Sequence, residues 1–218
     1  TVEIGEQLWM KENLKVTRYN DGSEIPTGYS DTLWTILSTG AYAVYNDDSL
    51  NANIYGNLYN WYAVDDSSGV CPEGWNVPTD AEYTELVDYL GGQSVAGGKM
   101  KEAGFEHWDS PNTGATNESG FTGLPGGYRY YSYGYYGMGY FGYFWSSTEY
   151  YNNNAWGRLL GYHYSEVYRY NYGKSYGFSV RCVRDLDYLT IRYLDEPNNE
   201  AHLDDNFRDE WLTLSVDS

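Results

Sequence analysis

The first half of the chain carries one clear helical pattern. Thr79 or Asp80 is the expected N-cap, Glu82 follows Thr79 by three residues as in a capping box, and the glycine pair at 91–92 ends the segment. The apolar stripe between these signals consists of Tyr83, Leu86, Val87 and Leu90. The pattern predicts a helix over residues 80–90, and a shorter helix is expected within residues 94–103.

The remaining pattern up to residue 185 indicates strands and loops. Residues 3–16 alternate loosely, which predicts one or two short strands, and residues 58–64 are apolar on both faces, as in a buried strand. From Phe121 onward, short strand-like segments are separated by glycines and no helical period is present. The fold class that follows is α+β, with most of the sheet in the second half.

The composition changes after Asp185. Residues 186–218 hold nine acidic residues and two arginines, and two segments within them alternate like half-buried strands. We therefore expect one domain over residues 1–185. Residues 186–218 are expected to be an acidic appendage, which forms a strand hairpin or pairs with a second chain during assembly.

Charge and hydropathy exclude several functions. The 218 residues include 13 Lys and Arg against 31 Asp and Glu, a net charge of −18. This charge disfavours nucleic acids and anionic membrane surfaces as partners. The chain contains no apolar run of the roughly 18 residues that a membrane span needs, so we expect no membrane insertion.

Tyrosine is concentrated in one window. Of the 27 tyrosines, 16 fall between Tyr128 and Tyr176, interleaved with Gly, Asn and Ser. Antibody loops favour the same residues, because tyrosine offers a large rigid contact face at low entropic cost. The window predicts a ligand-binding surface. The alternatives are a tyrosine-rich core with edge strands, or a low-complexity adhesive segment.

Cys71 and Cys182 are too few for a metal cluster and too distant for a CxxC redox motif. A disulfide between them is favoured, with two buried unpaired thiols as the alternative.

Six sequence blocks resemble one known family. The blocks are QLWMKENL (7–14), GNLYNW (56–61), CPEGWNVPTD (71–80), LPGGYR (124–129), WSSTE (145–149) and GFSVRCVRD (177–185). They resemble, in order, the Fibrobacter succinogenes major paralogous domain, which has a C-type-lectin-like fold. The resemblance covers about residues 1–185.

The resemblance implies helices packed on a twisted antiparallel sheet with long irregular loops that face a ligand. It also implies secretion or cell-surface display in bacteria, or carriage on a phage particle. The same fold serves the variable proteins of diversity-generating retroelements, in which template adenines are replaced at random. Most residues of the tyrosine window are reachable from an asparagine codon in this way. Those that are not include Trp145, Glu149, Trp156, Glu166 and Lys174.

We therefore predict a receptor-like or adhesin-like module that binds a protein or glycan on a cell surface, with oligomerisation possible through the appendage. Trp145 and Trp156 are expected in the core. The expected contact residues are Tyr130, Tyr131, Tyr133, Tyr135, Tyr136, Leu159, Tyr162, His163, Tyr164, Tyr168, Tyr170, Asn171, Tyr172, Ser175 and Tyr176.

Three alternatives use the same chain differently. A fixed carbohydrate-binding protein would stack these aromatic rings on sugars. Calcium could be held by acidic pairs such as Asp47-Asp48 or Asp65-Asp66, although solvated turns explain those pairs better, and no metal or other cofactor is expected. Formylglycine-generating enzymes share the fold but need closely spaced cysteines. Because the sequence lacks that spacing and any other catalytic motif, we expect no enzymatic activity.

Overall fold

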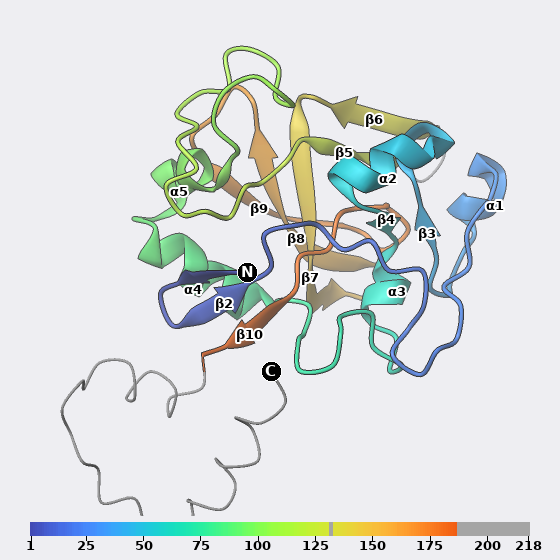
Figure 1. The fold of residues 1–218 in the computed structure, drawn as a ribbon. Helices are drawn as coiled ribbons and strands as arrows, with labels where there is room; N and C mark the ends of the chain where they lie inside the picture. Colours follow the sequence, from blue (N-terminus) through green and yellow to red (C-terminus); the bar gives the residue numbers. More distant parts are fainter. Residues whose placement is uncertain (131–132, 187–218) are drawn as a thin grey trace, which may run out of the picture. The chain divides into compact units, whose positions relative to one another are not determined.

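The computed structural model describes residues 1–130 and 133–186 (Figure 1). The predicted appendage lies outside these residues apart from Leu186, and so does Tyr131. The helical segments are α1 (Asp31–Thr35), the 3-10 turn η1 (Tyr45–Asp47), α2 (Ser49–Tyr55), α3 (Trp61–Val64), α4 (Asp80–Tyr89) and α5 (Gln93–Met100). The strands are β1 (Val2–Ile4), β2 (Gln7–Trp9), β3 (Tyr42–Ala43), β4 (Leu58–Tyr59), β5 (Gly126–Tyr130), β6 (Gly134–Met138), β7 (Phe141–Tyr151), β8 (Asn154–Gly161), β9 (Val167–Gly173) and β10 (Val183–Asp185).

Helix α4 begins and ends close to where the sequence predicts. The hydroxyl of Thr79 accepts a hydrogen bond from the Glu82 amide (3.1 Å), and the Glu82 carboxylate accepts one from the Thr79 amide (2.6 Å). This confirms the capping box, which satisfies amides that have no partner inside the helix. The second predicted helix is also present, as α5.

The predicted strand over residues 58–64 is wrong in its second half. Strand β4 ends at Tyr59, and Trp61 starts the short helix α3. The side chain of Asn60 causes the change, because its Oδ1 accepts hydrogen bonds from the amides of Ala63 (3.1 Å) and Ala41 (3.0 Å). A segment that is apolar on both faces does not distinguish a buried strand from a buried helical turn.

The main sheet confirms the α+β class. Its five strands run in the order β6-β5-β7-β8-β9 within the described residues. The pairing is antiparallel except between β5 and β7, which are parallel at Gly127 and Gly142, so the expectation of a wholly antiparallel sheet is wrong at this position. Gly127 has φ of +65°, and a Cβ there would lie 2.4 Å from the carbonyl oxygen of Tyr136. Only glycine fits this junction.

Two apolar clusters hold the layers together. One packs the buried faces of α4 and α5 against Trp9, Phe144, Leu160 and Val167. The other gathers β4 and α3 around Trp145 and Phe178. Trp145 is fully buried, as expected, whereas Trp156 is half-buried. In Figure 1, α5 lies beside β9 with α4 next to it, and α2 lies toward β6.

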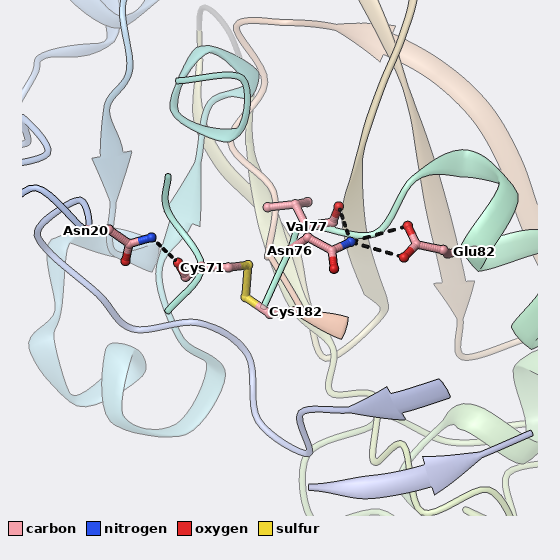
Figure 2. Close-up of a disulfide and its surroundings, with 6 residues drawn as sticks. All are labelled: Asn20, Cys71, Asn76, Val77, Glu82 and Cys182. Atoms are coloured by element: carbon pink, nitrogen blue, oxygen red, sulfur yellow. Dashed lines mark hydrogen bonds between the residues drawn. A yellow bond between two sulfur atoms is a disulfide. The ribbon is translucent and has the colours of Figure 1, made fainter. Parts of the chain in front are cut away.

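The two ends of residues 1–185 meet. Strand β2 pairs with β1 on one side and with β10 on the other, so Trp9 lies opposite Val183. Next to this pairing, Cys71 and Cys182 form a disulfide (Figure 2), which confirms the favoured prediction. In the described part of the chain, no helix is both long and apolar enough to cross a membrane.

Candidate functional site

The alternation of β9 separates its side chains between two environments. Arg169 faces α4, where its guanidinium contacts the carboxylate of Asp80 at 2.8 Å. Tyr168, Tyr170 and Tyr172 occupy the alternate positions, and their rings contact one another, with 5.7 Å between the centroids of Tyr168 and Tyr170 and 6.3 Å between those of Tyr170 and Tyr172. Successive residues of a strand face opposite sides, so the tyrosines of β9 form a row on the face away from α4.

The neighbouring strands extend this row. Leu159 on β8 lies in register between Tyr168 on β9 and Tyr143 on β7. Beside it, a Cβ on Gly157 would lie 3.3 Å from the ring of Tyr172. The glycine therefore leaves room for Tyr172 to reach across β8 toward Tyr143, and the centroids of these two rings are 5.6 Å apart.

Strands β5 and β6 continue the same network. Tyr128 pairs in register with Tyr136, and its ring lies 4.8 Å from that of Tyr143. Tyr130 contacts Tyr133 (5.9 Å between centroids) and Tyr176 (5.2 Å). We call the connected set the tyrosine surface: Tyr128, Tyr130, Tyr133, Tyr136, Tyr143, Leu159, Tyr164, Tyr168, Tyr170, Tyr172 and Tyr176.

The tyrosine surface has an inner and an outer layer. The inner rings pack on Phe178, which lies 4.8 Å from Tyr143 and 5.0 Å from Tyr172 between centroids. Burial raises the pKa of both hydroxyls. The outer rings remain accessible, with Tyr133 72% exposed and Tyr170 50% exposed. A rigid base thus carries exposed aromatic groups.

Several predicted contact residues lie elsewhere. Tyr135 is on the opposite face of β6, where its hydroxyl donates to Asp47 (2.6 Å). Asn171 faces the α4 side, where it accepts a hydrogen bond from Asn154 (2.8 Å). The carbonyl of Ser175 accepts a hydrogen bond from the Trp34 indole (2.6 Å). These residues are not members of the tyrosine surface.

Tyr162, His163 and Tyr164 form the turn between β8 and β9. The ring of Tyr164 contacts Tyr168 at 5.3 Å between centroids, whereas Tyr162 packs on Phe141 and Tyr140 at the rim. Sequence reasoning missed Tyr128 and Tyr143 as members of the surface. The two-residue period around them could have indicated a shared face, but their pairing partners come from distant parts of the chain.

The lysines and arginines of the tyrosine window are all paired. In the described part of residues 128–176, Arg129 pairs with Asp31, Arg158 and Arg169 pair with Asp80, and Lys174 pairs with Glu149. The tyrosine surface therefore presents ring faces and hydroxyls rather than free positive charge, a composition suited to uncharged or mixed contact areas.

The acidic pairs considered for calcium have local roles. Asp48 caps α2 by accepting a hydrogen bond from the Leu50 amide (3.0 Å), and Asp66 accepts one from the Ser68 amide (2.9 Å). These are ordinary capping and turn interactions.

A comparison with known protein families gives a match over most of the chain. The family described as the Fibrobacter succinogenes major domain matches residues 2–184, the range that holds the sheet and the tyrosine surface. No curated protein matches the chain. Since the match spans most of the chain and ends at the closing strand β10, the chain belongs to the Fibrobacter succinogenes major domain family.

Proposed function

We propose that this chain is a ligand-binding module of C-type-lectin-like fold whose tyrosine surface contacts a protein on a cell surface. The observation that carries the proposal is the connected layer of exposed tyrosine rings on a packed sheet. Such rings lose little conformational entropy on binding, because the inner layer and the strands already hold their backbone in place.

A binding role also agrees with the charge around the surface. Its basic residues are neutralised by acidic partners, so polyanions find no free cation within the described window. The disulfide agrees with secretion, display on a bacterial surface or carriage on a phage particle, because disulfides persist in oxidising compartments. We propose binding rather than catalysis as the role.

Retroelement diversification of the surface is part of the proposal. Its support is that residues which adenine replacement in an asparagine codon cannot produce have structural roles in the fold. Trp145 is fully buried and its indole donates to the carbonyl of Tyr59 (2.9 Å), while Lys174 pairs with Glu149 and lies over the ring of Trp61. Flanking DNA that carries a near-copy of this segment, differing almost only at adenines, would support this part, and DNA without such a copy would contradict it.

A fixed glycan-binding surface is the second candidate. The observation that favours it is the parallel stack of Tyr168 and Tyr170, with 5° between the ring planes. Aromatic faces of this kind also stack on the apolar faces of sugar rings.

An array of purified cell-surface ectodomains and glycans tests both candidates. We expect the chain to bind at least one ectodomain. The triple variant Tyr133→Ala, Tyr164→Ala and Tyr170→Ala should weaken that binding by about 100-fold, because central aromatic contacts dominate interface energies.

Tyr151→Ala is the matched control, because Tyr151 is as exposed as Tyr133 (72% each) and is outside the tyrosine surface. Undiminished binding by a folded triple variant would contradict the proposed surface. Binding to glycans alone would favour the second candidate.

A further inference from the structure

The loop that follows α5, residues 101–113, brings together three side chains that suit a metal ion. Oxygen atoms of Glu102 and Glu106 and a ring nitrogen of His107 all lie within 4.8 Å of one another. Around a tetrahedral zinc ion, with bonds of roughly 2.0–2.2 Å, ligand atoms are separated by about 3.3 Å. The separations between the three ligand atoms are therefore close to those around a zinc ion. A small movement of the exposed Glu106 side chain would bring its carboxylate to bonding distance.

The two inner ligands are already positioned. Nδ1 of His107 is hydrogen-bonded to both carboxylate oxygens of Glu102 (2.9–3.0 Å), an interaction that bonds to a metal ion would replace, and the two side chains are only 20% and 16% exposed. The ring of Tyr55 meets the His107 ring edge-on, at 5.6 Å between centroids. Little side-chain freedom would therefore be lost when a metal binds.

The loop carries negative charge that the protein does not neutralise with lysine or arginine. Among the described residues, no lysine or arginine forms an ion pair with Glu102, Glu106 or Asp109. The adjacent Lys101 is committed to three carbonyl oxygens, at 2.7–2.9 Å. A divalent cation would offset this charge at short range.

The loop also contains a buried oxygen without a partner. Asn112 is 5% exposed, and its Nδ2 donates to the carbonyls of Glu102 (3.0 Å) and Gly104 (2.7 Å). Its Oδ1 has no hydrogen-bond partner among the described residues. Buried acceptors normally have a hydrogen-bond donor. The loop therefore holds one oxygen acceptor, Oδ1 of Asn112, that no donor in the described part of the chain satisfies.

We propose that Glu102, Glu106 and His107 bind a divalent transition-metal ion, with zinc as the best fit. A mixed set of imidazole nitrogen and carboxylate oxygen suits zinc, whereas calcium and magnesium prefer oxygen ligands alone. The bound ion stabilises a loop that meets the rim of the tyrosine surface. There, the amide of Asp109 donates to the carbonyl of Gly139 (2.9 Å) and the amide of Thr113 donates to that of Tyr162 (2.7 Å).

Calorimetric titration of the untagged chain with zinc chloride tests the proposal. We expect one zinc site, and no comparable heat with calcium or magnesium. Glu106→Gln and His107→Gln should each weaken zinc binding by at least about tenfold, because even mutation of a residue that only hydrogen-bonds to a metal ligand lowers metal affinity by that factor. X-ray absorption spectroscopy at the zinc edge should show nitrogen and oxygen ligands.

Glu73→Gln is the matched control for Glu106→Gln, because both glutamates are exposed. Glu106→Gln is also expected to stay folded, since no core contact depends on it. Absence of zinc binding by the folded chain would overturn the proposal, as would equal zinc affinity of Glu106→Gln and the unchanged chain.

Discussion

Tyr170 and Tyr172 stand two residues apart on β9, yet the sheet gives them different surroundings. The ring of Tyr172 contacts Tyr143 and Phe178 of the core, whereas Tyr170 is 50% exposed. The same residue type thus supports the fold at one position and is free to contact a partner at the other. The number of tyrosines in the sequence does not show which of them are packed and which are exposed.

The Tyr172→Ala substitution is expected to lower the free energy of unfolding by about 3 kcal/mol, because it leaves a cavity among packed rings. Tyr170→Ala should lower it by less than about 1 kcal/mol, as exposed substitutions do. Urea denaturation of the two variants measures the difference. Equal losses would show that the inner and outer layers are not distinct.

Among the elements, the segment that connects α3 to α4, residues 71–78, is held at several points, and we call it the connector (Figure 2). Its Cys71 bonds to Cys182 near the closing strand, and the Cys71 carbonyl accepts a hydrogen bond from Asn20 (2.7 Å). Farther along, the side-chain Nδ2 of Asn76 donates to the Glu82 carboxylate (3.1 Å) at the start of α4. The connector therefore joins the N-terminal segment, the first main helix and the C-terminal end of the domain.

Removing the disulfide by Cys71→Ser and Cys182→Ser should lower the free energy of unfolding. The bond spans 111 residues, and closing a loop of that length stabilises by about 4 to 5 kcal/mol on the chain-entropy account. Urea midpoints with and without dithiothreitol measure the effect. The reductant should change the midpoint of the unchanged chain alone, and an equal change in the double variant would refute the assignment.

At the scale of the whole molecule, buried tyrosine hydroxyls couple folding to alkaline pH. Burial raises the pKa of Tyr59, Tyr143 and Tyr172, and burial with nearby Asp66 raises that of Tyr19 to about 12. In the unfolded chain tyrosine ionises near pH 10. The folded state therefore retains these protons when the unfolded state has lost them, and their stabilising contribution is complete only below about pH 10.

We expect the free energy of unfolding to fall steeply as pH rises above about 10. Lys101 acts in the opposite direction between about pH 8 and 10, because burial lowers its pKa to about 8, but it is a single group against several tyrosines. Urea midpoints from pH 8 to 12, with tyrosinate absorbance at 295 nm, follow both effects. Ionisation of all the tyrosines near pH 10 without unfolding would contradict the expectation.

The sequence by itself determined the features that depend on neighbouring residues or on recognisable blocks. These are the family, the α+β class, the capped helix α4 and the concentration of tyrosine in one window. Local signals suffice there, because caps and periodic stripes act over a few residues. Only tertiary structure decided that Tyr136 and not Tyr135 joins the tyrosine surface, that β5 runs parallel to β7, and that Tyr172 lies over Phe178. These depend on pairing between segments far apart in the chain, where register assigns every side chain to a face.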